Sequence, residues 1–531
     1  MSLPRGRACL DCRRRKVKCD GAAPACGRCV TGGHGSDCEY IDPESVSRIK
    51  SLEENIAKLE AKVARLERQK LSPTRTRPLR DIQIPGRGEA SVQTLYQKPI
   101  TSYPELPRDW WNNSILPLEV ARMLVDTYAP HAFNNGFFLH GPRFLQAMFP
   151  PDDSPPSLPL SLITVVYLWG IHLSGHQPLL IHEEKFLNLA IMHTLKPQQP
   201  HYIVPNIQAE VILAHYFLRK GKFNLAMHHL NSAISHSVAC GLHQIGLGAQ
   251  HPGASLTLPP PSDPVEFGQR IDAFWAVVLF HKSWVAALQW PSRVSTVLDD
   301  TISTPFPLEM DSYESGNLEF RTSNAQSTLK GFLENHETES TNSSLAIAVQ
   351  CAYLFERASY IGVEWQSVLY IPEEADQFHK FDRRIFEFIK TLPPEEAHPE
   401  RFRHTWLVSN SSIQAAIIQL HSSVNNPESQ TKCLQAAEKI VHMIYTIPQE
   451  LEHVNPILGT MWFVACRVLI SALSRLAKDP VTEEVVMQTS QLKVLLRSVL
   501  DAMSSFGNGC ALIYSQFGHA KELCKGHDIH L

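Results

Sequence analysis

Apolar side chains recur every three or four positions along most of the chain after residue 110. This spacing gathers them on one face of an α-helix. It predicts helices at residues 116–128, 160–173, 207–218, 223–240, 271–288, 345–360, 381–392, 406–422, 431–445, 456–476 and 483–503. Breaks that contain Pro, Gly or Asn separate these segments, and the alternation typical of strands is not seen. We therefore expect an all-α domain over residues 110–531, in which the polar stretch 301–342 forms a loop.

A heptad pattern occupies residues 42–72, ahead of that domain. Its seam positions hold Ile49, Leu52, Ile56, Leu59, Val63 and Leu66. β-Branched residues at the first seam position with leucine at the second favour a parallel two-stranded coiled coil. Arg48 would face Glu53 of a partner helix and Lys62 would face Glu67, which supports pairing. Dimerisation is the favoured interpretation, and an amphipathic helix packed on its own domain is the alternative.

Composition and charge divide the chain of 531 residues into unlike parts. Its net charge of −4 hides a basic N-terminal region in front of a mildly acidic remainder, a distribution that favours a nucleic-acid-binding segment on an ordinary soluble body. Residues 73–109 are rich in Pro, Gly, Ser, Thr and Arg and are expected to form a linker, whose arginines either are solvated or add phosphate contacts. No segment is expected to span a membrane, because each apolar run is short or carries charged residues.

Half of the twelve cysteines lie within thirty residues near the N-terminus. They are Cys9, Cys12, Cys19, Cys26, Cys29 and Cys38. Two Cys-x-x-Cys pairs, each followed by a lone cysteine, bring thiolates together in the way that structural zinc sites require. Six thiolates are two short of the eight needed by two separate four-coordinate ions, and they suffice if two sulfurs are shared. The pattern therefore predicts a cluster of two Zn²⁺ ions.

A disulfide framework is the alternative for an even number of cysteines. The first ten residues are polar and basic, without the apolar stretch of a secretion signal. The other six cysteines are scattered singly, as in proteins of reducing compartments. Zinc is the favoured interpretation.

Five cations lie between the second and third cysteines of this pattern. They are Arg13, Arg14, Arg15, Lys16 and Lys18. Residues 1–38 contain eight Lys and Arg against three Asp and Glu, more than is needed to offset the charge of six thiolates on two zinc ions. A basic strip held between metal ligands is typical of a phosphate-binding surface.

The spacing Cys-x2-Cys-x6-Cys-x6-Cys-x2-Cys-x8-Cys, with Cys-Arg-x-Arg-Lys-x-Lys-Cys-Asp inside it, resembles the fungal binuclear zinc cluster family of transcription factors. The resemblance implies that two of the cysteines bridge both ions and that each ion is completed by two others. The implied assignment is Cys9 and Cys26 as bridges, Cys12 and Cys19 on one ion, and Cys29 and Cys38 on the other.

The same resemblance implies a DNA-reading role for the basic strip. Lys16 would read bases in the major groove over a CGG triplet, with Arg15 beside it, since lysine and arginine donors suit guanine O6 and N7. Arg13, Arg14 and Lys18 are assigned to phosphate or sulfur contacts. The implied partners are double-stranded DNA, a second copy of the chain and transcription co-regulators, and the implied location is the nucleus.

Part of the helical domain resembles the fungal-specific transcription factor domain, also called the middle homology region. The resemblance rests on residues 137–144, 226–243, 269–275 and 305–307, and it implies a regulatory domain. This chain has His281-Lys282 where many members carry an acidic residue before the basic one. The expected fold class is thus mostly α, with a zinc cluster domain (1–41), a coiled coil (42–72), a linker (73–109) and a large all-α regulatory domain (110–531).

Motifs of common enzymes are not found in the helical domain. It contains no His-Glu-x-x-His, phosphate-loop, nucleophile-elbow or dinucleotide fingerprint, so no enzymatic function is expected. His172, His176 and His182 lie close in sequence, and helix-face or cap histidines are favoured over a second metal site. Two functions remain: a dimeric sequence-specific DNA-binding regulator, or a helical receptor or scaffold that uses the cluster only as a structural clip.

Overall fold

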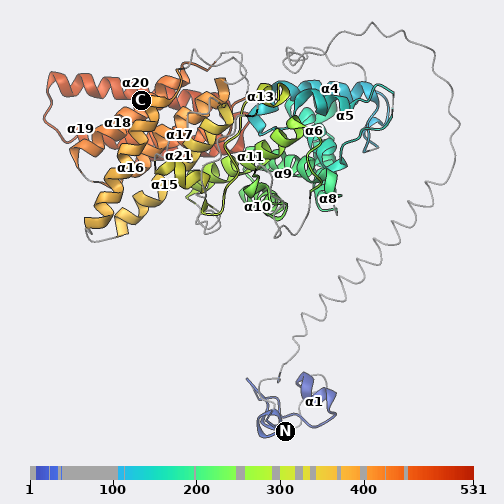
Figure 1. Cartoon of the computed structure of the whole chain (residues 1–531). Helices are drawn as coiled ribbons and strands as arrows, with labels where there is room; N and C mark the ends of the chain where they lie inside the picture. Colours follow the sequence, from blue (N-terminus) through green and yellow to red (C-terminus); the bar gives the residue numbers. More distant parts are fainter. Residues whose placement is uncertain are drawn as a thin grey trace. The chain divides into compact units, whose positions relative to one another are not determined.

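The computed structural model divides the chain into two compact units, Met1–Gly88 and Glu89–Leu531, and each is described by itself (Figure 1). In the first unit it describes residues 8–22, 24–33 and 38. In the second it describes residues 106–530 apart from 113, 153, 197–198, 247–257, 290–298, 317, 319–326, 335–342, 368–371, 395–402, 425 and 448–452. The predicted coiled coil at 42–72, with its seam from Ile49 to Leu66, and nearly all of the predicted linker lie outside the described residues.

The described residues of the first unit form two short helices, α1 (Leu10–Arg14) and α2 (Gly27–Thr31). Each begins directly after a cysteine whose sulfur accepts a backbone N–H three residues on. The Cys12 N–H lies 3.4 Å from Cys9 Sγ, and the Cys29 N–H lies 3.4 Å from Cys26 Sγ. Within this described part, the core consists of the six cysteines, with two alanines packed against it. Because so little apolar surface is buried, we expect bound metal to supply most of this unit's folding free energy.

The second unit is built from helices, and no strand occurs among its described residues. The longer helices are α4 (Leu118–Tyr128), α5 (Gly141–Met148), α6 (Leu160–Leu173), α8 (Glu183–Thr194), α9 (Ile203–Arg219), α10 (Phe223–Ala239), α11 (Pro264–Leu288), α15 (Ser344–Ser367), α16 (Pro372–Thr391), α17 (Arg403–His421), α18 (Pro427–Ile444), α19 (Ile457–Leu476), α20 (Glu483–Gly507) and α21 (Ala511–Gly526). Shorter elements include η4 (Ala129–His131), η5 (Phe133–Asn135), α7 (Gln177–Leu180), α13 (Met310–Glu314) and α14 (Thr328–Leu333).

All eleven predicted helices are present, although their ends differ. α11 begins at Pro264, seven residues before the predicted start, because the Asp263 carboxylate accepts the Glu266 N–H at 2.9 Å and proline occupies the first helical position. The expected loop at 301–342 is partly wrong, since α13 and α14 form within it. The helices α5, α8 and α21 were not predicted.

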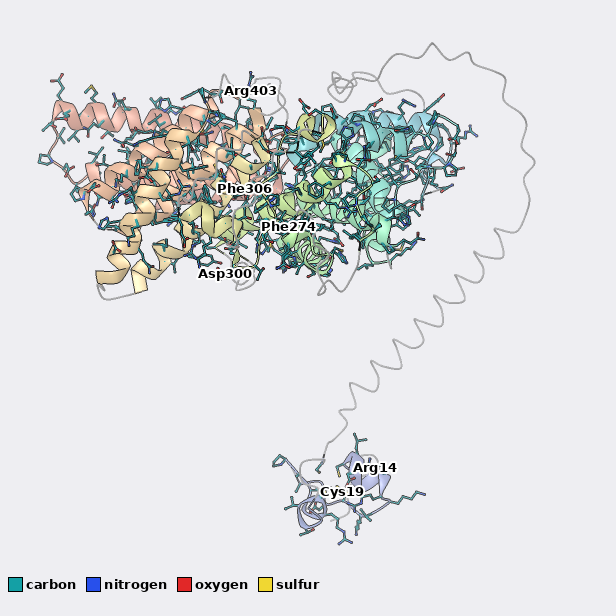
Figure 2. The ribbon with its side chains drawn as sticks, in the orientation of Figure 1. Arg14, Cys19, Phe274, Asp300, Phe306 and Arg403 are labelled. Carbon is teal, nitrogen blue, oxygen red and sulfur yellow. The ribbon has the colours of Figure 1, made fainter. Side chains whose placement is uncertain are left out.

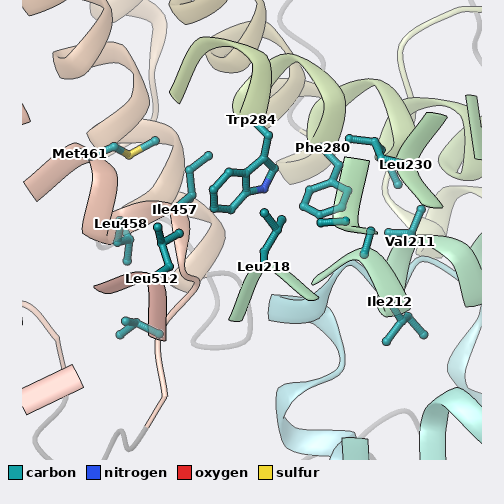
Figure 3. Close-up of a cluster of buried hydrophobic side chains, with 14 of the residues drawn as sticks. Val211, Ile212, Leu218, Leu230, Phe280, Trp284, Ile457, Leu458, Met461 and Leu512 are labelled. Atoms are coloured by element: carbon teal, nitrogen blue, oxygen red, sulfur yellow. The ribbon is translucent and has the colours of Figure 1, made fainter. Parts of the chain in front are cut away.

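The helix α11 connects the two halves of a single core. It packs against α9 and α10 on one side and against α15 and α19 on the other. Figure 3 shows Trp284 of α11 with Ile457 and Met461 of α19 on one side and Phe280 on the other, and with Leu218 of α9 below the two rings. These side chains are buried, so residues far apart in sequence share one continuous apolar interior.

Two helices bear on the expectation that no segment spans a membrane. By length and composition, α11 and α19 are apolar enough to cross a membrane. The most apolar 18-residue stretches of α11 and α19 are 83% and 72% buried inside the protein. Burial of this extent is the usual situation of core helices in a globular domain.

Buried charges also join α11 to α15. The Lys282 Nζ lies 2.7 Å from an Asp299 carboxylate oxygen and 2.6 Å from Glu356 Oε2 on α15. The ammonium lies 4.9 Å from the centre of the Tyr353 ring. The His281-Lys282 pair, whose role the sequence did not reveal, thus places a buried cation against two carboxylates.

Close contact between α15 and α17 depends on a glycine. A Cβ atom at Gly362 would lie 2.3 Å from the backbone oxygen of Gln419, so Gly362→Ala must push the helices apart. We expect it to lower the free energy of unfolding by about 1–3 kcal/mol, as overpacking does. Urea denaturation of the full chain measures this change.

Gly518 in α21 is the matched control, because a Cβ atom there would meet nothing within 4 Å. Gly518→Ala is expected to raise stability by about 0.5–1 kcal/mol, since alanine favours helix more than glycine. If both substitutions had the same effect, the α15–α17 contact would not depend on Gly362.

Candidate metal centre and nucleic-acid interface

The sulfur atoms of the first unit form two overlapping groups of four. One group is Cys9, Cys12, Cys19 and Cys26, and the other is Cys9, Cys26, Cys29 and Cys38. Within each group all sulfurs lie within 4.8 Å of one another, and Cys9 and Cys26 belong to both. The cysteines are not joined by disulfides, so the disulfide framework is not observed.

Sulfur separations within the groups fit zinc. The Cys9 and Cys26 sulfurs are 3.8 Å apart, those of Cys12 and Cys26 are 3.6 Å apart, and those of Cys9 and Cys29 are 3.7 Å apart. A tetrahedron with Zn–S bonds of about 2.3 Å has an edge of about 3.8 Å. The six-cysteine cluster therefore provides two metal sites with the donor chemistry of a binuclear zinc centre.

Backbone N–H groups favour the thiolate form of the two sulfurs common to both groups. Burial alone would raise the pKa of Cys9, but the Cys12 N–H and neighbouring thiols lower it below its ordinary value. The pKa of Cys26 is lowered in the same way, against burial, by the Cys29 N–H and neighbouring thiols. Burial raises the pKa of Cys12 to about 12. The first negative charges are thus expected on Cys9 and Cys26.

Asp20, directly after the third cysteine, joins the two halves of the domain. Its carboxylate oxygens lie 3.1 and 3.0 Å from the Gly27 backbone nitrogen, at the start of α2. A Cβ atom at Gly27 would lie 2.6 Å from Asp20 Oδ2. This contact gives the aspartate of the Lys-Cys-Asp sequence a structural role that the pattern alone did not reveal.

Lys16 occupies an unusual backbone conformation at the end of α1. Its φ is 54°, in the left-handed region that favours glycine and costs other residues about 1–2 kcal/mol. The Val17 N–H donates to the Cys12 carbonyl at 3.0 Å, which closes the helix with the turn typical of a left-handed C-terminal residue. The turn directs the chain away from α1 between two metal-ligand positions.

The predicted cations differ in their surroundings. Arg14 and Arg15 form ion pairs of 3.0 and 3.3 Å with the buried Asp11, whose Oδ2 also lies 3.7 Å from Cys29 Sγ. Lys16 and Lys18 are exposed and make no ion pair with any residue that the structure describes. The side chain of Arg13 lies outside the described residues. Figure 2 labels Arg14 on α1 and Cys19 in the loop beyond it.

The three histidines considered as a second metal site are engaged separately. His172 Nδ1 donates to Glu183 Oε1 at 2.8 Å, and its Nε2 accepts the Arg219 Nε–H at 3.2 Å. The His182 ring stacks on Trp111 with centroids 4.1 Å apart. Among the described residues, metal-capable groups of His, Cys, Asp and Glu occur only in the cysteine cluster.

The stretches that resemble the middle homology region contact one another. Gln269 accepts the His140 backbone N–H at 3.0 Å, and the Trp275 indole N–H donates to the Pro305 carbonyl at 2.7 Å. The Thr304 hydroxyl donates to the Leu242 carbonyl at 2.6 Å. These segments therefore belong to one packed region, independently of any family assignment.

Residues 7–47 match the fungal Zn(2)-Cys(6) binuclear cluster domain. The first unit therefore carries a cluster domain of this class. The chain is 54% identical over 44 residues to the C6 finger domain transcription factor hasF of Aspergillus fumigatus. It is 51% identical over 45 residues to the nitrogen assimilation transcription factor nit-4 of Neurospora crassa, and 46% identical over 46 residues to the transcription factor PDR1 of Candida glabrata.

These similarities cover a small part of each protein. They span 8–9% of this chain and 4–6% of the relatives. The relatives are transcription factors, which are not enzymes, and the middle homology region is not detected. No solved structure matches the chain.

Proposed function

We propose that the protein is a sequence-specific DNA-binding regulator of transcription that acts in the nucleus. The observation that carries the proposal is the turn after α1, which holds the exposed Lys16 and Lys18 between the ligand positions Cys12 and Cys19. A short helix held by two metal ions presents its cations rigidly, which a phosphate-lined groove requires. The sequence similarity to transcription factors supports the same class of function.

The proposed metal ligands are the six cysteines of the cluster. Cys9 and Cys26 would bridge both Zn²⁺ ions, Cys12 and Cys19 would complete one, and Cys29 and Cys38 the other. Membership of Cys9 and Cys26 in both sulfur groups supports this assignment, and so does the stabilisation of their thiolates by backbone N–H groups. Zinc binds thiolates, not thiols.

The proposed DNA contacts follow from the surroundings of each cation. Lys16, exposed and without an ion pair among the described residues, would donate to guanine O6 or N7 of a CGG-like half-site. The residue accepts a costly left-handed φ, which supports a role for its side chain. Arg15, oriented by Asp11, would lie beside Lys16, and Arg13, Arg14 and Lys18 would contact phosphates.

Dimer binding is the further part of the proposal. The heptad at residues 42–72 would pair two chains, so that two clusters read two half-sites. The residues between cluster and heptad would set the half-site separation. The helical unit would act as the regulatory domain, of the middle homology type, and would recruit co-regulators.

Lys16→Ala is expected to abolish preference for CGG-containing duplexes while zinc content is kept. The loss of discrimination against a duplex with an altered triplet is expected to be about tenfold or more, the size of one good base contact. Fluorescence anisotropy with both duplexes, at fixed salt, measures this ratio. Lys16→Gly should lose the same discrimination, because glycine fits the left-handed turn but carries no donor.

Lys18→Ala removes an equal charge from the same strip and serves as the control. It is expected to weaken binding to both duplexes alike and to reduce the salt dependence by about one ion. Unchanged sequence preference in the Lys16→Ala and Lys16→Gly chains would contradict the assignment of Lys16. The scaffold alternative, in which the cluster is only a clip, would then be favoured.

A further inference from the structure

A cavity of about 280 Å³ lies inside the helical unit. The side chains along one face of α11 form part of its wall, at positions spaced three to four residues apart from Asp272 to Trp284. Other walls come from the η4–η5 region, α9, α13, α17 and the N-terminal ends of α15 and α19. Phe280 and Trp284, seen in Figure 3, contribute aromatic surface. A mostly apolar, partly open pocket at a meeting point of several helices is the usual form of a small-molecule site.

Buried polar atoms without hydrogen-bond partners are concentrated on this cavity. Among the residues that the structure describes, Tyr128 Oη, His215 Nδ1, Asp272 Oδ1, Ser409 Oγ and both ring nitrogens of His404 are buried and unpartnered. The exposed fractions of Tyr128 and Asp272 are 1% and 8%. Each such atom costs about 1–3 kcal/mol, and native proteins rarely leave them unpaired. Several unpartnered polar atoms on one cavity indicate that a bound ligand would supply their hydrogen-bond partners.

The charges of the wall select the kind of ligand. Among the described lining residues there are four carboxylates, Asp272, Glu309, Asp311 and Glu314, and no lysine or arginine. Glu309 accepts the Ser344 N–H at 2.8 Å, and Glu314 lies 2.6 Å from His140 Nε2. A wall of this composition repels anions and lacks a counter-charge for Asp272.

The titration of the wall shows what a bound cation would have to change. Burial raises the pKa of Asp272 well above its ordinary value, and the neighbouring Glu309 charge raises it further. Burial alone thus favours the uncharged carboxyl, and an ammonium ion beside it would favour ionisation. Burial lowers the pKa of His215 to about 3 and that of His404 to about 4, so both rings are neutral at neutral pH. The histidines therefore supply hydrogen bonds and not positive charge.

We propose that this cavity binds a small organic cation: an aromatic or aliphatic body that carries a protonated amine. The ammonium would pair with Asp272 and the apolar body would contact Phe280 and Trp284. Tyr128, His404 and Ser409 would supply further hydrogen bonds. Aromatic faces and carboxylates together are the surroundings that bind organic ammonium ions. This inference does not depend on the proposed DNA-binding function.

Three probes that share an indole body and differ in charge test the proposal on the full chain. Tryptamine is a cation, tryptophol is neutral and indole-3-acetate is an anion at neutral pH. Isothermal titration calorimetry is expected to detect tryptamine binding about tenfold tighter than tryptophol, the size of a charge-assisted hydrogen bond. Indole-3-acetate is expected not to bind.

Two variants locate the site. Asp272→Asn keeps the side-chain shape and is expected to fold, because the native carboxyl lacks a charged partner; it should weaken tryptamine binding about tenfold or more. Glu314→Gln changes an acid of the same wall that is already paired with His140 and should weaken binding less than about threefold. Equal affinity for tryptamine and tryptophol, or unchanged tryptamine affinity in Asp272→Asn, would overturn the proposal. Failure of all three probes to bind at millimolar concentration would also overturn it.

Discussion

A Cys9→Ser chain is expected to lose both metal ions and the fold of the cluster domain. Cys9 belongs to both groups of four sulfurs, and its side chain is completely buried, so one substitution leaves each site with three sulfurs. The residues of the domain that the structure describes bury almost no apolar surface besides the cysteines. Small domains of this kind depend on metal binding for folding. Metal analysis of the purified full chain is expected to fall from two zinc ions per chain in wild type to nearly none.

Two other cysteine substitutions test whether the loss of both ions arises because Cys9 is shared by the two metal sites. Cys38 belongs to a single group, so Cys38→Ser leaves four sulfurs around the other site and is expected to retain about one ion per chain. Cys240 lies buried in the helical unit, outside both groups, and Cys240→Ser is expected to retain two. A Cys9→Ser chain that keeps two ions would contradict the bridging assignment.

Lys282→Ala is expected to destabilise the helical unit by about 3–5 kcal/mol, the cost of removing one partner from a buried ion pair. The Lys282 side chain is 3% exposed, and that of Glu356 beside it is 2% exposed. Burial raises the pKa of Asp299 to about 6 even next to this lysine, so Asp299 is mainly ionised at neutral pH. Without Lys282 the buried acidic groups would lose their shared cationic partner. Urea denaturation at neutral pH, followed by circular dichroism, measures the loss.

An exposed lysine pair provides the comparison. Lys380 lies 2.6 Å from Asp376 on α16, but their side chains are 71% and 62% exposed. Lys380→Ala is expected to change stability by less than about 1 kcal/mol. If Lys282→Ala cost no more than this, the buried cluster between α11 and α15 would contribute nothing measurable to stability.

Local features of the chain could be predicted from the sequence. The cysteine cluster is encoded by spacing within thirty residues, and the structure brings the same six sulfurs together. The long helices were predicted because periodic apolar residues act over a few turns. α21 was missed because only four of its sixteen residues are buried, which weakens the periodic signal. α13 and α14, with five and six residues, are too short to show one.

Features that depend on distant segments could not be predicted. The sequence around Lys282 does not indicate that its partner is Glu356, which lies 74 residues further on. The cavity is lined by segments that begin at residue 125 and end at residue 457, so no local pattern marks it. The left-handed φ of Lys16 also has no sequence signal, because lysine is not a residue that favours this region. Tertiary packing and metal-site geometry decide these features.

Selection from a random DNA library by the zinc-loaded full chain tests the central claim most directly, with the Lys16→Ala chain selected in parallel. The proposed function predicts enrichment of paired CGG triplets at one fixed spacing for wild type, and loss of that preference in the variant. Enrichment of a single CGG triplet would support the assignment of Lys16 as the base-reading residue and would contradict binding as a dimer. Absence of any enriched sequence at moderate salt would contradict sequence-specific DNA binding itself.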